Sequence, residues 1–272
     1  MSKSSIFANY DWDDNIMYMP TKIIYFAKNP NTLIKEIAVS TEGFAHSRST
    51  VGVKNHVMNF VEDNGLFVQS GDESNSVAID LLDYQIIYAD DQSFREFRDH
   101  DTEDYFMKDL KQALAENKFA PSFNDFVEHC NNEFSAKNVK IITARGQSPS
   151  TIHKGLVYLQ TLGFIKFVPE LKNIFPVSYR GSELADEFKA SASSPQEAKM
   201  KVLATVLDKM NQDHAGATFG FSDDDKKTFD YTENFIKEEV SKNRWTNIEI
   251  NLYFTGNKTK ERKIMLTRPE VA

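Results

Sequence analysis

The spacing of hydrophobic residues along the chain changes in character near residue 90. Before that point, short runs rich in β-branched and aromatic residues alternate with turn residues, which predicts strands. These runs lie at residues 6–10, 22–27 and 33–40, and within 51–68 and 77–88. Asn29-Pro30-Asn31 is typical of a turn, so the second and third runs are predicted to form a hairpin. From residue 92 to residue 134 the spacing is helical, as in Phe106, Leu110 and Leu114.

After residue 138, compact apolar runs alternate with helical segments, which predicts an α/β fold with a parallel sheet. The strands are expected at 139–143, 174–179, 217–221 and 248–255, and the helices from Pro149, over 195–210 and over 227–241. Ser194, Pro195 and Glu197 form a typical helix start. The β-rich first third interrupts this alternation. We therefore predict a Rossmann-like core from 1–20 and 90–272, with 21–89 inserted as a β-rich cap.

Composition restricts the classes of protein that remain. The 272 residues are 40% hydrophobic and 26% charged, which excludes a wholly disordered chain. The net charge of −8 disfavours a general nucleic-acid coat protein. Cys130 is the single cysteine, so an intramolecular disulfide and a multi-cysteine zinc site are both excluded. With no secretory signal and no apolar run of membrane-spanning length, we expect a cytoplasmic protein without a membrane partner.

Polar groups follow three of the expected strands directly. Asp11 and Asp13 follow the first, Thr143 ends the second, and Asp223 and Asp224 follow the strand at 217–221. Ligands of open α/β sheets collect at the carboxyl ends of the strands, so these groups are expected to converge. Clustered carboxylates require a cation, and Mg²⁺ suits oxygen ligands and a phosphate substrate. Asp11 could then act as a nucleophile and Asp13 as a general acid and base.

Each of these motifs also has a plain structural interpretation. Asp-x-Asp recurs at residues 99–101 and 223–225, and Ser222 could simply cap the following helix. Arg145-Gly146 could be a tight loop, or it could bind an anion before a helix N-terminus. Lys199 could be a solvated helix lysine, with Lys201 beside it.

The order of the motifs resembles that of the haloacid dehalogenase (HAD) superfamily. The four segments are IFANYDWDDN at 6–15, IITARG at 141–146, Lys199 within a helix, and FGFSDD at 219–224. The resemblance implies that Asp11 forms an aspartyl-phosphate and that Asp13 protonates the leaving group and activates water. It implies that Thr143 and Lys199 hold the phosphoryl oxygens, and that Mg²⁺ is bound by Asp11, Asp13 through its carbonyl, Asp223 and Asp224. Lys201 is the alternative to Lys199.

The sequence departs from the family pattern at two positions. Asn15 stands where threonine or valine is usual, and Lys227 stands where one version of the last motif has an aspartate. The segments at 19–22, 40–45 and 121–123 are similar to microbial and phage members of the superfamily. The retained Asp13 favours phosphoryl transfer over halide chemistry, because an alkoxide leaving group needs a proton.

The resulting expectation is a Mg²⁺-dependent phosphatase acting on a phosphorylated small molecule. Arg145 and Gly146 are the expected substrate-binding residues, with Arg48 and Arg180 as further candidates for binding a substrate anion. One alternative is a HAD-fold binding or scaffold protein without turnover. A second is a nucleic-acid end phosphatase that uses the basic run Lys258, Lys260, Arg262, Lys263 and Arg268. The leaving group and the oligomeric state are not predicted.

Overall fold

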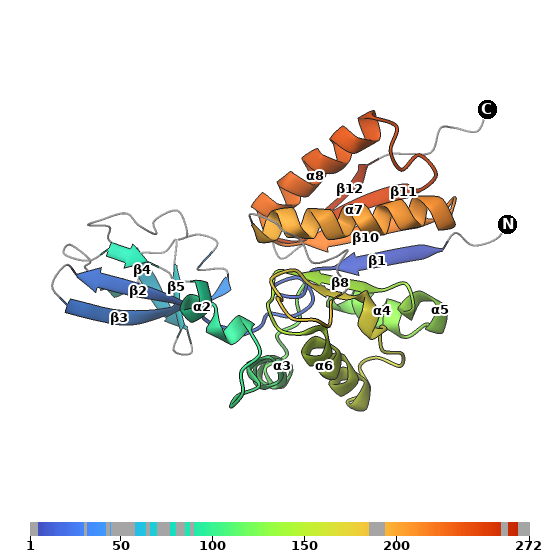
Figure 1. The fold of residues 1–272 in the computed structure, drawn as a ribbon. Helices are drawn as coiled ribbons and strands as arrows, with labels where there is room; N and C mark the ends of the chain where they lie inside the picture. The colour runs from blue at the N-terminus through green and yellow to red at the C-terminus, as the bar shows by residue number, and fades with distance from the viewer. Residues whose placement is uncertain are drawn as a thin grey trace. The chain divides into compact units, whose positions relative to one another are not determined.

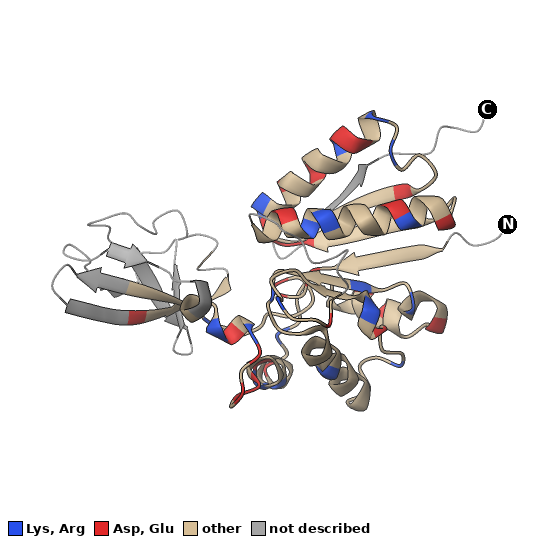
Figure 2. Cartoon of the chain, in the orientation of Figure 1, with Lys and Arg blue, Asp and Glu red and all other residues tan. Residues whose placement is uncertain are grey.

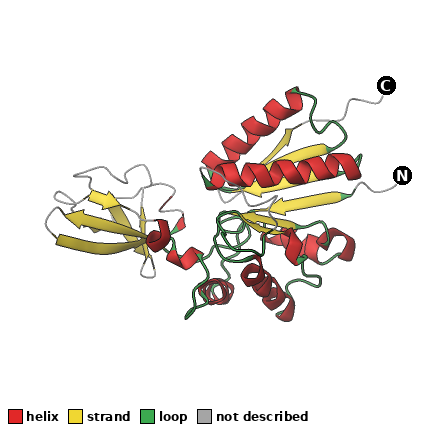
Figure 3. Cartoon of the chain, in the orientation of Figure 1, coloured by secondary structure: helices red, strands yellow, loops and turns green. Residues whose placement is uncertain are grey.

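The chain divides into two compact units. One comprises Met1–Met19 with Phe106–Ala272, and the other comprises Pro20–Tyr105, so the second unit extends past the segment at 21–89 predicted as an insertion. The computed structural model describes residues 5–29, 32–41, 44, 58–63, 66–69, 77–79, 85–87, 90–184, 194–256 and 261–265. Figure 3 shows strands in both units and most of the helical residues in the first.

The first unit contains a six-stranded sheet, and the first five of its strands confirm the predicted parallel α/β arrangement. These are β1 (Ile6–Tyr10), β8 (Lys140–Thr143), β9 (Ile174–Pro176), β10 (Thr218–Asp223) and β11 (Glu249–Phe254), joined by β12 (Glu261–Met265). The strand order is β12-β11-β10-β1-β8-β9, and only β12 pairs antiparallel to its neighbour. The N-terminal strand therefore lies in the middle of the sheet.

Helices cover both faces of this sheet, and each face has its own hydrophobic core (Figure 1). The helices are α3 (Tyr105–Ala115), α4 (Phe123–Cys130), α5 (Glu133–Ala136), α6 (Pro149–Thr161), α7 (Pro195–Asp213) and α8 (Lys226–Ser241). Phe7 packs with α7 and α8 on one face, whereas Ala8 and Tyr10 pack with α3, α4 and α6 on the other. This alternation is the two-residue period of a strand buried on both faces.

A local signal in the sequence explains where α7 begins. Ser194 caps α7, because its Oγ accepts a hydrogen bond from the backbone N of Glu197 at 3.2 Å.

Along α7 and α8, residues of opposite charge alternate (Figure 2) and pair at i, i+4, as in Lys201 with Glu197 and Lys237 with Glu233. No helix among the described residues has the length and apolar composition needed to cross a membrane.

The start of α8 corrects one interpretation of the sequence. Strand β10 continues through Ser222 to Asp223, two residues beyond the predicted end. Asp225 is the residue that caps α8, accepting a hydrogen bond from the backbone N of Lys227 at 2.9 Å. The interpretation of Ser222 as the helix cap is therefore wrong, because parallel pairing with β1 and β11 holds Ser222 in the strand.

The second unit is built on a separate six-stranded sheet. Its strands are β2 (Ile23–Asn29), β3 (Thr32–Val39), β4 (Met58–Asp63), β5 (Leu66–Gln69), β6 (Val77–Ile79) and β7 (Gln85–Ile87), in the order β6-β4-β5-β3-β2-β7. Strands β2 and β3 form the predicted antiparallel hairpin, and only β3 with β5 pairs in parallel. Helix α2 (Asp90–Ser93) follows, and Arg95 pairs with Glu36 of β3 at 2.9 Å.

Candidate active site

The strand order brings the expected strand-end residues to one edge of the sheet. Strand β1 lies between β8 and β10, and all three run in the same direction. Tyr10 pairs with Ser222, and the backbone N of Asp11 donates to Ser222 O at 3.0 Å. Asp11 and Asp223 are the next residues, so both lie at the carboxyl ends of these adjacent strands. Thr143 ends β8 at the same edge and is fully buried.

Three carboxylates meet at this edge around one buried lysine. Asp11, Asp223 and Asp224 each offer a carboxylate oxygen within 4.8 Å of the others. The Nζ of Lys199 lies 2.6 Å from Asp11 Oδ2 and 2.8 Å from Asp223 Oδ2. Lys201 pairs instead with Glu197 at the surface of α7. Of the two lysines that the sequence leaves open, Lys199 is therefore the one that contacts the carboxylates.

Burial makes full ionisation of these carboxylates unfavourable. Burial raises the pKa of Asp223 to about 7, although Lys199 opposes the shift. Burial and the neighbouring carboxylates also raise the pKa of Asp224 well above its ordinary value. Burial alone would lower the pKa of Lys199, but Asp11 and Asp223 outweigh it and raise that pKa. If all three carboxylates were ionised, one ammonium would leave two excess negative charges, which a divalent cation with oxygen ligands would balance.

Asp13 lies beside this cluster and is bound to an arginine. Arg145 donates from Nε to Asp13 Oδ2 at 2.8 Å and from Nη2 to Asp13 Oδ1 at 2.6 Å, a bidentate pair. Arg145 is fully buried, and its guanidinium carbon lies 5.1 Å from the centre of the Phe106 ring. Burial raises the pKa of Asp13, and Arg145 opposes that shift. The expected anion-binding arginine therefore contacts the expected acid and base directly.

The residues next to Arg145 are positioned by the end of β8. The backbone N of Arg145 donates to Thr143 Oγ1 at 3.3 Å, and Arg145 Nη1 donates to Gln147 at 3.3 Å. Gly146 follows in a half-buried position before α6, whose N-cap is Ser148. Thr143, Arg145 and Gly146 therefore form one continuous turn between β8 and α6.

A tight turn after β1 directs the side chains of Asp11 and Asp13 toward different partners. The backbone N of Ile16 donates to Trp12 O at 3.0 Å, and Asp14 adopts the left-handed conformation with φ of 54°. Aspartate tolerates this conformation better than most residues. The Trp12 ring is fully buried, and its centroid lies 5.3 Å from that of the Phe106 ring. This contact anchors the turn in the core. Asp11 therefore faces Lys199 while Asp13 faces Arg145.

The side chain of Asn15 forms hydrogen bonds with four segments of the chain near the carboxylates. Its Nδ2 donates to Asp11 O at 3.1 Å, to Ser222 O at 3.0 Å and to Ser222 Oγ at 2.8 Å. Its Oδ1 accepts from Ser122 Oγ at 2.8 Å and from Thr255 Oγ1 at 3.0 Å. The sequence indicated Asn15 only as a departure from the family pattern. Ser122, Ser222 and Thr255 were missed as its partners because nothing local in the sequence connects them.

Other candidates lie elsewhere. Arg180 is exposed in the loop after β9, and Asp99 and Asp101 are exposed in the second unit. Arg48, Lys258, Lys260 and Arg268 lie outside the described residues, as do the side chains of Arg262 and Lys263 in β12.

Comparisons with known proteins add no relative to this picture. No family model, no curated protein and no solved structure matches the chain. The arguments for a function therefore come from the motifs and from the geometry of this strand-end cluster.

Proposed function

We propose that the first unit is a HAD-like phosphohydrolase that depends on Mg²⁺ and acts through an aspartyl-phosphate on Asp11. The observation that carries the proposal is the buried cluster in which Lys199 bridges Asp11 and Asp223, with Asp224 alongside and Asp13 next to it. The carboxylate oxygens of Asp11, Asp223 and Asp224 would hold the ion. When bound, Mg²⁺ would neutralise excess charge and polarise a phosphoryl oxygen.

The chain's own groups fit the two halves of the reaction. Asp11 Oδ2 accepts from Lys199 and Oδ1 accepts from the backbone N of Trp12 at 2.8 Å, so the carboxylate is fixed in orientation. One of its oxygens would attack phosphorus while the bond to the leaving oxygen breaks and Asp13 donates a proton to that oxygen. Water would then attack the aspartyl-phosphate while Asp13 accepts its proton, which releases phosphate and restores Asp11.

Arg145 has a defined place in this proposal. In the structure both oxygens of Asp13 accept hydrogen bonds from Arg145. A proton on Asp13 would neutralise the carboxylate and so would weaken both of these bonds. An anionic phosphate would compete for the guanidinium and free one oxygen of Asp13. Arg145 would thus bind the phosphorylated substrate and time the proton transfer in the same movement.

The test is release of phosphate from p-nitrophenyl phosphate by the full chain, with Mg²⁺ and with EDTA. Asp11→Asn is the test variant. Asp230→Asn is the matched control, because Asp230 pairs with Lys226 at the surface of α8, away from the cluster. We expect turnover that requires Mg²⁺, falls to background in Asp11→Asn and is unchanged in Asp230→Asn.

Two results would count against the proposal. Full turnover by Asp11→Asn would remove the covalent mechanism. Absence of turnover on the aryl phosphate and on a panel of sugar phosphates, nucleotides and nucleic-acid ends, in a chain that still binds Mg²⁺, would favour a binding protein instead.

A further inference from the structure

A half-buried lysine at the amino end of the sheet has no ion-pair partner among the described residues. Lys140 is the first residue of β8 and pairs in register with Asn9 of β1. Within the described part of the chain, its ammonium group makes neither a hydrogen bond nor an ion pair. The proposed phosphatase chemistry belongs to the carboxyl ends of these strands and does not use Lys140.

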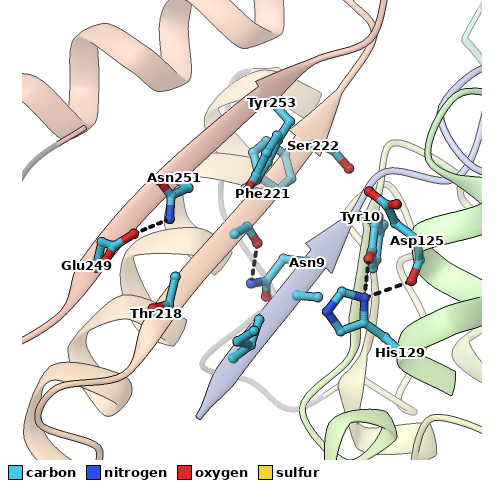
Figure 4. A pocket seen from close by; sticks show the side chains of 13 residues that line it. Asn9, Tyr10, Asp125, His129, Thr218, Phe221, Ser222, Glu249, Asn251 and Tyr253 are labelled. Atoms are coloured by element: carbon cyan, nitrogen blue, oxygen red, sulfur yellow. Dashed lines mark hydrogen bonds between the residues drawn. The ribbon is translucent and has the colours of Figure 1, made fainter. Parts of the chain in front are cut away.

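The side chain of Lys140 lies on the face of the sheet that α7 covers. Its Nζ is 5.6 Å from the centre of the Phe7 ring, which packs in the core with α7 and α8. The His214 ring, just after α7, also contacts Phe7, with 4.8 Å between the centroids. Tyr10 lies on the other face, where its hydroxyl contacts His129 beside a groove of about 260 Å³ (Figure 4). The Lys140 ammonium therefore rests on a phenyl ring, which attracts a cation but accepts no ordinary hydrogen bond.

The charged groups around Lys140 are mainly positive. Burial is the main cause of a pKa lowered to about 8, and Lys172 and Lys209 add to that shift. Lys172 lies just before β9, and Lys209 lies near the end of α7. Glu170 opposes the shift, but its carboxylate is paired with Lys172 at 2.6 Å. These surroundings disfavour an ammonium group at this place and would favour an anion there.

We propose that Lys140 is a site of reversible carbamate formation with carbon dioxide. The lone pair of the neutral Nζ would attack the carbon of carbon dioxide and form an N–C bond. One C–O π pair would move onto oxygen, and Nζ would release a proton to water. The product is a carbamate anion, and a proton returned to the nitrogen would break the N–C bond and restore the amine. This inference does not rest on the proposed phosphatase activity.

The reaction has two requirements, and the surroundings of Lys140 meet both. The amine must be neutral to act as a nucleophile. Near neutral pH the lowered pKa gives on the order of a hundredfold more neutral amine than an ordinary lysine has. The product must be stabilised as an anion, and Lys172 and Lys209, which repel an ammonium, would attract a carbamate. Carbon dioxide is small and uncharged, so a half-buried side chain is accessible to it.

The experiment traps the carbamate on the full chain with triethyloxonium, in a neutral buffer equilibrated with isotopically labelled carbon dioxide. The reagent ethylates the carbamate oxygen, and peptide mass spectrometry then locates the labelled lysine. Lys111 is the internal control, because its Nζ also lies over a ring, 5.5 Å from the centre of Tyr158, but the residue is exposed. Both lysines are compared in one sample, so the result does not depend on the folding of a variant.

We expect about tenfold or more label on Lys140 than on Lys111. Lys172→Gln and Lys209→Gln should each lower the label on Lys140 about threefold, because each removes a positive charge that would attract the carbamate. Lys237→Gln removes a surface charge of α8 and should leave the label unchanged. Circular dichroism of each variant would establish that the fold is retained.

Two results would overturn the proposal. The first is a label on Lys140 no greater than that on Lys111. The second is a label that stays unchanged in both Lys172→Gln and Lys209→Gln, because the carbamate would then form without the charges that should stabilise it.

Discussion

Replacing Asn15 with leucine tests whether the hydrogen-bond junction below the carboxylates holds the first unit together. Leucine has nearly the same shape as asparagine but can neither donate nor accept a hydrogen bond. The variant would lose three bonds from Nδ2 and two to Oδ1, all of them in a fully buried position.

The expected cost follows from the groups left behind. Thr255 Oγ1 would lose its acceptor, while Ser122 Oγ would keep only Ser222 Oγ at 3.4 Å. A buried polar group left without its partner costs about 1–3 kcal/mol. The carbonyl of Ser222 keeps its bond from the backbone N of Asp11 and should contribute little. For these two hydroxyl groups together, we expect the free energy of unfolding to fall by about 2–6 kcal/mol.

Urea denaturation followed by tryptophan fluorescence would measure this change selectively. The chain has two tryptophans, Trp12 and Trp245, both buried and both in the first unit. The signal therefore reports unfolding of that unit alone. Asn211→Leu is the matched control, because Asn211 Oδ1 accepts a single exposed hydrogen bond from the backbone N of Asn247. It should cost about 1 kcal/mol.

A loss below about 1 kcal/mol in Asn15→Leu would refute the reasoning. It would mean that the hydroxyl groups of Ser122 and Thr255 find other partners at no cost. The junction would then be a consequence of packing rather than a support for the strand ends.

Three further changes have calculable directions. Asp224→Asn should stabilise the metal-free protein, because burial and the neighbouring carboxylates raise the pKa of Asp224, and it should abolish the stabilisation by Mg²⁺. Thermal unfolding with EDTA and with Mg²⁺ measures both effects, and a destabilised variant would contradict the first. Burial lowers the pKa of Lys140 from 10.5 to about 8, so wild-type stability should rise with pH between these values. Lys140→Met should remove that rise and stabilise the chain by up to about 3 kcal/mol at neutral pH, and a rise that persists in the variant would have another origin. Ser194→Ala should cost about 1 kcal/mol by removing the cap of α7, which denaturation would detect, and an unchanged midpoint would show that the cap is dispensable.

Much of the fold could be predicted because the signals are local. Strand β1 has the predicted bounds, and α7 begins at Pro195 as its capping residues indicate. Errors occurred where two local signals coincide. Ser222 has the composition of a helix cap, but pairing with β1 and β11 extends β10 past it. The pairing with β1 connects residues more than two hundred positions apart, so no local pattern could reveal it.

The candidate site divides in the same way. The strand-end carboxylates were predictable because parallel strands end at one edge, and that rule needs only the order of elements. The pair of Asp13 with Arg145 was not, because it depends on how the turn from Asp11 to Met17 bends.

The central position of β1 also determines the order in which this chain can fold during synthesis. Both edges of β1 are completed by later segments, by Lys140–Thr143 on one side and Thr218–Asp223 on the other. Strand β1 must therefore wait for both partners until the chain has been made up to residue 223. The β2–β3 hairpin needs only contacts between neighbouring residues and can form during that delay. Until β10 emerges, β1 is an apolar strand with an open edge, which makes the nascent chain a candidate for chaperone binding.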